Sequence, residues 1–164
     1  MNLDNIGIKR LPHDKEKIFR RILSEIRMDS RFDSMTNFIQ HGDTTVREHC
    51  IHVAETAYFI AIKFGIDVDE EALIRGALLH DYFLYDWHEK SAANMIHGFT
   101  HPRKAYNKAK EDFVLSRVEA DMIIHHMFPL TPNHPKTKEG AILCIADKLC
   151  ATGETIRGKL PWRV

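Results

Sequence analysis

The sequence predicts an all-α protein built as one domain. Apolar residues recur with the period of a helix in most of the chain, and no segment shows sustained strand-like alternation. Residues that favour helix starts stand before several of the apolar runs. The length of 164 residues is typical of a single domain, which we expect to span residues 1–164.

Two helices are predicted in the N-terminal part. The first is amphipathic and spans residues 15–27, and a weaker, shorter one spans residues 32–40. The apolar stripe of the first helix consists of Ile18, Ile22, Leu23 and Ile26.

A long helix is predicted to begin after Thr45. Glu48 follows Thr45 by three residues, which is the spacing of a capping box. The apolar pattern continues to Phe64, and Gly65 then provides a C-terminal stop.

The next helix is predicted to begin at Asp67, because Glu70 repeats the capping pattern, and to run through Asp81. The mixed aromatic and polar residues that follow, 82–100, predict a loop or a short helix.

Three further helices are predicted in the C-terminal part. They span residues 101–110, with Pro102 in the first turn, then 116–126, and finally 136–152 after a proline-rich loop. Residues from Gly153 onward are predicted to form a tail outside the last helix.

Composition excludes several classes of partner. Lys and Arg together number 23, as do Asp and Glu, so no net charge favours nucleic acid or a membrane surface. No apolar segment approaches the roughly 20 residues that cross a bilayer, and none resembles a signal peptide. The cysteines Cys50, Cys144 and Cys150 lie in apolar helical stretches without a CxxC pair, which indicates reduced thiols and a cytoplasmic protein.

Polar residues that bind metals interrupt the apolar faces of the predicted helices. His49 lies on the same stripe as Val53, His80-Asp81 ends an apolar helix, and Asp147 lies in AILCIADKLCA. A buried carboxylate of this kind needs a cation or strong hydrogen bonds. Singly, each residue also fits an ordinary hydrogen-bonded interior position, but together, and with eleven histidines in the chain, they predict a metal site.

These residues resemble a known family. His49, His80-Asp81 and Asp147 match the H…HD…D pattern of the HD superfamily of metal-dependent phosphohydrolases, and the resemblance covers a core of about residues 44–151 after an N-terminal helical extension. It implies the helical HD-domain bundle and a small phosphorylated substrate such as a nucleotide. It also implies that these four residues hold a divalent ion.

The remaining histidines are similar to those of the five-histidine subgroup, which binds two ions. In that subgroup Asp81 would bridge to a second ion held by His101, His125 and His126, although His97 competes with His101 for its place. Imidazole and carboxylate ligands suit Fe, Mn, Zn, Co or Ni better than Ca or Mg. We therefore expect one or two divalent transition metal ions.

The implied mechanism is attack on phosphorus by a metal-activated water. Asp81 is the predicted catalytic ligand, and Lys148 and Arg103 flank ligand positions where they can contact phosphate, although solvated helix charges explain them equally well. The lysine that often follows the HD motif in the subgroup is absent here, where the sequence reads Tyr82-Phe83-Leu84. The layout is similar to that of bacterial diadenosine tetraphosphate hydrolases, so a dinucleoside polyphosphate is one candidate substrate.

Two alternatives stay open. Some HD-fold proteins use a di-iron site to activate oxygen, and their ligands overlap with this set. A non-catalytic module that senses a nucleotide through the same site is the other. The sequence predicts no particular oligomeric state.

Overall fold

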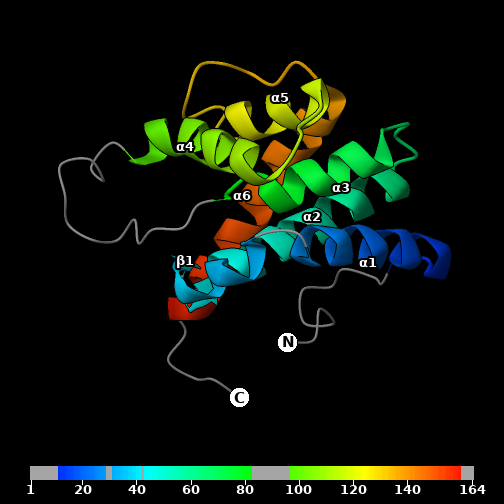
Figure 1. Ribbon diagram of the computed structural model, residues 1–164, viewed down its shortest axis with the longest axis horizontal. Coiled ribbons are helices and arrows are strands. Elements are labelled where there is room, and N and C mark those ends of the chain that lie inside the picture. The colour runs from blue at the N-terminus through cyan, green and yellow to red at the C-terminus, as the bar shows by residue number, and fades with distance from the viewer. Residues whose placement is uncertain (1–10, 29–30, 42, 83–96, 160–164) are drawn as a thin grey trace.

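Helices form nearly all of the regular structure (Figure 1). The computed structural model describes residues 11–28, 31–41, 43–82 and 97–159. Within these ranges the only sheet is an antiparallel pair of short strands, β1 (Ile39–His41) and β2 (Thr44–Thr45). The all-α prediction is confirmed. None of the helices in the same ranges is both long and apolar enough to cross a membrane.

The first predicted helix is present as α1 (His13–Met28). Ile22 and Ile26 of the predicted stripe are buried together with Phe19, and the other two members are partly buried. This face packs mainly against α3 (Glu70–Leu79), so α1 covers the bundle from one side.

The weaker helix predicted next is shorter than expected. Phe32–Asn37 form a 3₁₀ helix, η2, and Phe38 then turns the chain into extended conformation, with φ −121° and ψ 133°. Phe32 and Met35 are both fully buried, and residues three apart are eclipsed in a 3₁₀ helix. β1 follows and places Gln40 in the interior, with 6% of its surface exposed.

The long central helix is α2 (Val46–Lys63), and its predicted capping box is confirmed. Thr45 Oγ1 accepts a hydrogen bond from the Glu48 backbone N–H at 3.3 Å, and Glu48 Oε2 accepts one from the Thr45 N–H at 3.0 Å. Gly65 follows the helix with a φ of 61°, a conformation that favours glycine at a helix end.

The predicted start of α3 at Asp67 is wrong by two residues. Asp69 is the N-cap, and its carboxylate accepts a hydrogen bond from the Ala72 N–H at 3.0 Å. Asp67 is instead fully exposed. Both aspartates can cap a helix, but Val68 between them packs against the core, which leaves Asp69 at the point where the chain turns into the helix.

α4 (His97–Asp112) begins about one turn before the predicted position. Pro102 therefore lies inside the helix, where it removes one backbone hydrogen bond. α5 (Arg117–His125) agrees with its prediction, and Ser116 and Glu119 form a capping box at its start. The loop or short helix predicted before α4 lies largely outside the described residues.

The last helix, α6 (Lys138–Lys159), is longer than predicted. The expectation of a tail from Gly153 onward is wrong, since the helix continues through this residue. Glycine in a helix costs about 1 kcal/mol relative to alanine. The next residue, Glu154, is 2% exposed, and its carboxylate is hydrogen-bonded to His49 of α2. This interaction offsets the cost of Gly153 in the helix.

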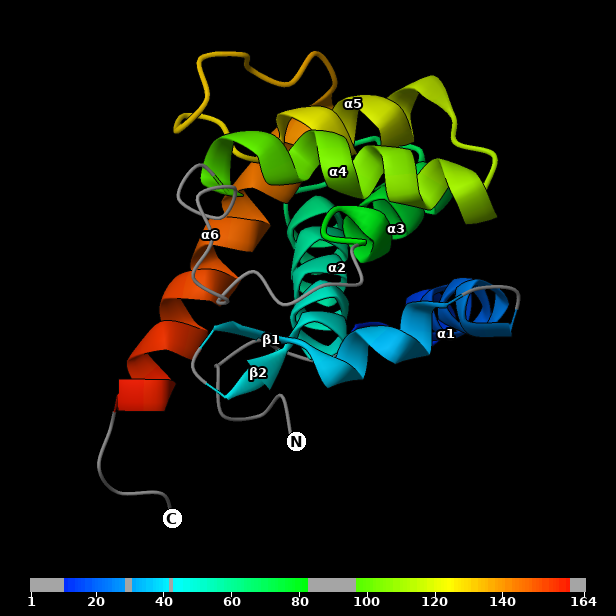
Figure 2. The same cartoon turned by 60° about the vertical axis from the view of Figure 1, so that its left-hand side comes forward.

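Figure 2 shows α2 near the centre of the bundle, between α1 and α6. α3 and α6 form its largest contacts, and α5 packs against both of them. α3 and α5 approach closely at Gly76, where an added Cβ would lie 2.5 Å from Met122 Sδ. This approach brings the C-terminal ends of α3 and α5 together.

Candidate metal centre

Six buried histidine and aspartate side chains, contributed by the segments α2 to α6, gather in the interior of the bundle. None is more than 8% exposed. They are His49 of α2, His80 and Asp81 at the end of α3, His101 of α4, His126 at the end of α5, and Asp147 of α6.

Three of the histidines have their Nδ1 atoms engaged outside the cluster. His80 Nδ1 donates to the Ala77 carbonyl at 2.7 Å, and His126 Nδ1 donates to the Ile123 carbonyl at 2.8 Å. His49 Nδ1 lies 2.8 Å from Glu154 Oε2. Carbonyl and carboxylate oxygens only accept, so each Nδ1 carries a hydrogen. Each Nε2 faces the cluster.

His49 and Asp147 form the pair between α2 and α6. His49 Nε2 lies 3.1 Å from Asp147 Oδ1. Burial by itself lowers the pKa of His49, but the hydrogen bonds to Asp147 and Glu154 outweigh it and raise the pKa to about 10. Burial raises the pKa of Asp147, and the hydrogen bond from His49 together with the charge of His80 reverses this and holds the pKa well below its usual range. The environment of the pair thus favours a positive charge between His49 Nε2 and Asp147 Oδ1.

His80 and Asp81 contain buried atoms without a hydrogen-bond partner, namely His80 Nε2 and Asp81 Oδ1. His80 Nε2 lies 3.5 Å from Asp81 Oδ2 and 3.8 Å from Asp147 Oδ1. Burial raises the pKa of Asp81, whereas the charges of His80 and His101 hold it well below its usual range. An unsatisfied buried polar atom costs about 1–3 kcal/mol, so a ligand for these atoms would offset a real penalty.

His101 and His126 form the other side of the cluster. Their Nε2 atoms lie 2.7 Å apart. His101 Nε2 lies 3.1 Å from Asp81 Oδ1, and His126 Nε2 lies 3.4 Å from the same oxygen. The second oxygen, Asp81 Oδ2, accepts a hydrogen bond from Gln40 Nε2 at 2.5 Å. Asp81 therefore has one oxygen toward this histidine pair and the other toward His80 and Gln40.

The donor atoms fit a bound divalent metal ion. Two groups have ligand atoms within 4.8 Å of one another, and they share one histidine. Imidazole nitrogens combined with carboxylate oxygens suit transition metals. The groups are His49, His80 and Asp147, and His80, Asp81 and His126.

Three predicted site residues occupy different surroundings. His125 is half-buried, and its Nδ1 lies 2.8 Å from Asp121 Oδ1 rather than in the cluster. Lys148 lies beside the cluster, donating to the His126 carbonyl at 2.9 Å with Nζ 3.6 Å from Asp147 Oδ2. Arg103 is an exposed residue of α4. The side chain of His97, the alternative ligand, lies outside the described part.

Gln40 and Glu154 are hydrogen-bonded to members of the cluster, and the sequence did not predict either contact. Gln40 lies on β1 in a segment expected to be a weak helix, and its Oε1 is buried without a partner. Glu154 lies in the segment for which the sequence predicts a tail. His52, one turn after His49, is the sequence signal that could have found it, since two histidines on one helix face can share a partner. In the structure His52 Nδ1 lies 3.0 Å from Glu154 Oε1.

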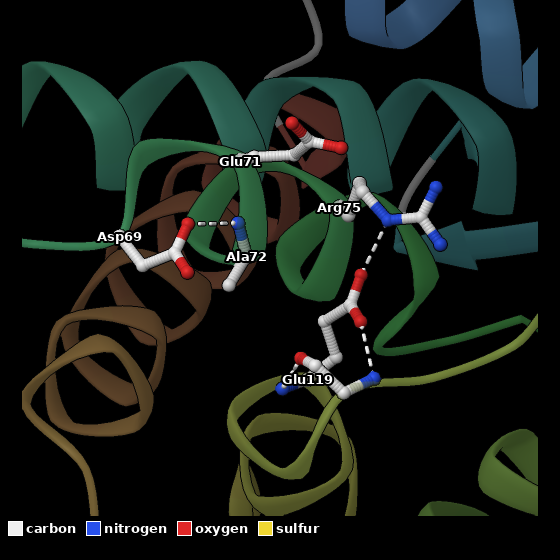
Figure 3. Close-up of a pocket in the computed structure, with 6 residues that line it drawn as sticks. Asp69, Glu71, Ala72, Arg75 and Glu119 are labelled. Carbon is white, nitrogen blue, oxygen red and sulfur yellow. Dashed lines mark hydrogen bonds and ion pairs between the residues drawn. The ribbon is translucent and has the colours of Figure 1, made fainter.

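A surface pocket of about 210 Å³ lies between the N-terminal ends of α3 and α5 (Figure 3). Two of its charged groups pair with each other, since Arg75 Nε donates to Glu119 Oε1 at 2.5 Å, and a third, Asp69, caps α3. None of the clustered histidines and aspartates lines it. We assign this pocket no role in the metal centre.

Comparison with known families agrees with the geometry. The model of the HD domain family matches residues 46–152, more than half of the chain, and the chain belongs to this family. HD domains are typically metal-dependent hydrolases. The match includes every clustered histidine and aspartate but neither Gln40 nor Glu154. No curated protein and no solved structure matches the chain.

Proposed function

We propose that this chain is a metal-dependent phosphohydrolase that cleaves a nucleotide or another small phosphoester, with water as the nucleophile. The observation that carries the proposal is the convergence of buried imidazole Nε2 atoms and carboxylate oxygens, in which His80 Nε2 and Asp81 Oδ1 have no hydrogen-bond partner. A cluster of this kind supports a metal better than it supports a structural hydrogen-bond network.

The proposed ligands fall into two sets that share Asp81. His49, His80, Asp81 and Asp147 would hold one ion. His101 and His126, which lie 3.1 and 3.4 Å from Asp81 Oδ1, would hold a second ion with Asp81. His125 is engaged with Asp121 and is outside the proposed set.

A bound divalent transition metal ion lowers the pKa of a water ligand and polarises phosphoryl oxygens. The protein supplies the remaining requirements. The Nδ1 hydrogen bonds of His49, His80 and His126 fix these rings with Nε2 toward the cluster. Asp81 and Asp147 carry only two negative charges, so two divalent ions would leave the site attractive to a phosphate.

Lys148 and Arg103 are the proposed phosphate contacts. Lys148 donates one hydrogen bond to the His126 carbonyl, and an ammonium group has three N–H donors. The remaining donors lie at the edge of the cluster, and the side chain is 43% exposed. A phosphate of a small substrate can therefore reach Lys148. A dinucleoside polyphosphate is one candidate among such substrates.

The test combines metal analysis with a substrate panel. Protein purified without chelator or nickel resin is analysed for metals, and then assayed with nucleoside phosphates, dinucleoside polyphosphates and a simple aryl phosphate. We expect bound transition metal and phosphate release, and we expect Asp81→Asn to abolish turnover while the protein stays folded. His134→Gln is the matched control, because His134 is exposed and outside the cluster.

Three outcomes would overturn the proposal. One is unchanged turnover in Asp81→Asn. The second is bound iron with oxygen consumption and no phosphate release, which would favour the di-iron oxygenase. The third is tight nucleotide binding without turnover in fully metal-loaded protein, which would favour the sensing module.

A further inference from the structure

A buried chain of hydrogen bonds links α2 to the end of α6 beside the metal centre. It runs from His52 through Glu154 to His49. We propose that Glu154 is a positioning residue of the metal centre, which holds His49 in the orientation that binds metal, and that His52 holds Glu154. This inference rests on the proposed metal centre but not on the reaction that it performs.

The geometry gives each oxygen of Glu154 a separate task. Oε2 lies 2.8 Å from His49 Nδ1, and Oε1 lies 3.0 Å from His52 Nδ1. The Glu154 side chain is 1% exposed, so solvent does not compete for these hydrogen bonds. With Nδ1 donating to Glu154, the lone pair of a neutral His49 lies on Nε2, 3.1 Å from Asp147 Oδ1.

His49 needs a side-chain partner because of its position in α2. His80 and His126 are at the C-terminal ends of their helices, where carbonyls in the last turn have no intrahelical partner and accept from the imidazoles. His49 lies near the start of a helix, where nearby carbonyls are used by the helix itself. The Glu154 carboxylate of α6 therefore accepts from His49 Nδ1, as backbone carbonyls accept from the Nδ1 atoms of His80 and His126.

His52 adds the second constraint. It lies three residues after His49 and therefore on the same face of α2. A glutamate side chain has several rotatable bonds, and contact with His52 leaves its carboxylate in one arrangement relative to His49. A carboxylate that accepts from a metal-bound imidazole also makes that ligand more basic.

The position of Glu154 explains why α6 extends past Gly153. Glu154 also lies beyond residues 46–152, the part matched by the family model. The interaction is thus a property of this chain that the family match does not supply.

The experiment measures metal affinity of Glu154→Ala and Glu154→Gln by competition between the chelator-stripped protein and a chromogenic chelator for zinc. We expect Glu154→Ala to bind zinc about 10–100-fold more weakly than the wild type. Glu154→Gln should lose less, because its amide oxygen can still accept from His49 Nδ1. His52→Gln should also lose less than Glu154→Ala, because it removes the support and leaves the carboxylate.

Glu139→Ala is the matched control. Glu139 is a buried carboxylate of the same helix, and its Oε1 accepts from the Asp69 N–H at 3.0 Å, away from the cluster. Loss of stability alone should affect Glu139→Ala and Glu154→Ala alike, whereas only Glu154→Ala should lose zinc affinity. NMR spectra that correlate ring protons with ring nitrogens should show the His49 proton on Nδ1 in the zinc-loaded wild type.

Wild-type zinc affinity in folded Glu154→Ala would overturn the inference and leave the proposed function intact. If Glu154→Ala does not fold, Glu154→Leu decides, because it fills the space but cannot accept from His49 Nδ1, and wild-type affinity in that variant would overturn the inference. Absence of zinc binding by the wild type would overturn the metal centre itself, and with it both proposals.

Discussion

At the scale of single residues, the cluster is defined by which nitrogen of each imidazole faces inward. His49, His80 and His126 all use Nδ1 for a partner outside the cluster, and two of those partners are backbone carbonyls. The orientation is therefore set by the fold before any ligand binds. Preorganisation of this kind reduces the ordering that binding would otherwise require.

Lys148 is the residue for which a role in substrate binding is most directly testable. Replacement by methionine keeps the apolar stem and removes the charge. A hydrogen bond to a charged group contributes about 1.5–3 kcal/mol, so Lys148→Met should lower kcat/KM roughly 10- to 100-fold, mainly through KM. Steady-state kinetics with a hydrolysed phosphoester measure this.

Two further variants serve as controls for Lys148→Met. Lys138→Met removes an exposed lysine of the same helix that lies 3.7 Å from Asp67 Oδ2, and should leave kcat/KM unchanged. Lys148→Arg keeps the charge and should retain most activity. Lowered zinc affinity in Lys148→Met would assign the loss to the hydrogen bond with the His126 carbonyl instead of to substrate contact.

The sequence supports prediction of the ligands better than of their partners. His80-Asp81 and Asp147 are visible because strong ligands interrupt apolar helices, and that contrast needs no knowledge of the fold. Gln40 and Glu154 carry no such contrast, since glutamine near a turn and glutamate near a helix end are ordinary surface residues. Their roles follow from long-range packing, which brings residues about one hundred positions apart together at His49 and Glu154.

At the scale of the elements, helix ends decide where the ligands lie. The capping box at Thr45 fixes the first turn of α2 and thereby the direction of His49. The ends of α3 and α5 supply His80 and His126. Local capping chemistry predicted the start of α2 well. It misplaced the start of α3, where Val68 packing selects Asp69 over Asp67 as the cap. The end of α6 was also misplaced, because the helix continues through Gly153.

Two glycine substitutions test this account with opposite expected signs. Gly153 lies in α6 with open space around an added Cβ, so Gly153→Ala should stabilise the protein by about 0.5–1 kcal/mol. At Gly76 the Cβ would lie 2.5 Å from Met122 Sδ, so Gly76→Ala should destabilise by about 1–3 kcal/mol. Thermal unfolding of both variants measures the two effects. A lower melting temperature for Gly153→Ala would contradict a continuous α6.

The contact between α1 and α3 should weaken in acid. Glu70 accepts from Lys15 Nζ at 2.5 Å and from the Tyr58 hydroxyl at 2.6 Å, and these bonds, that from Lys15 first, lower its pKa from 4.5. A lowered pKa means that the ionised carboxylate stabilises the folded state above pH 4.5 and that this stabilisation disappears as the pH falls through the folded-state value. The group is partly exposed, so its contribution is about 1 kcal/mol or less.

Urea unfolding measures the effect in Glu70→Gln. The variant should be less stable than the wild type at neutral pH, and the difference should shrink below about pH 4. Glu71→Gln is the control, because Glu71 is an exposed neighbour whose nearest ion-pair partner, Arg21, is 4.0 Å away. A difference between the wild type and Glu70→Gln that does not change with pH would contradict the ionic contribution.

At the scale of the whole molecule, the candidate metal centre is also the point at which side chains of α2 to α6 meet. A ligand there contacts side chains that the unfolded chain does not hold together, so binding should favour the folded state. The cost of the unsatisfied His80 and Asp81 atoms falls on the metal-free protein. The metal binding that the proposed hydrolysis requires should therefore also stabilise the bundle.

Removal of metal should lower the melting temperature of the wild type. At a free metal concentration 100-fold above Kd, binding stabilises the folded state by about 2.7 kcal/mol. For a chain of this size each kcal/mol corresponds to roughly 2–4 °C, so the expected shift is about 5–11 °C. Scanning calorimetry of chelator-stripped protein with and without added zinc or manganese measures it. Asp147→Asn should lose most of the metal-dependent shift in melting temperature, whereas His134→Gln should retain it. Equal melting temperatures of the wild type with and without metal would contradict a metal centre that joins the five helices.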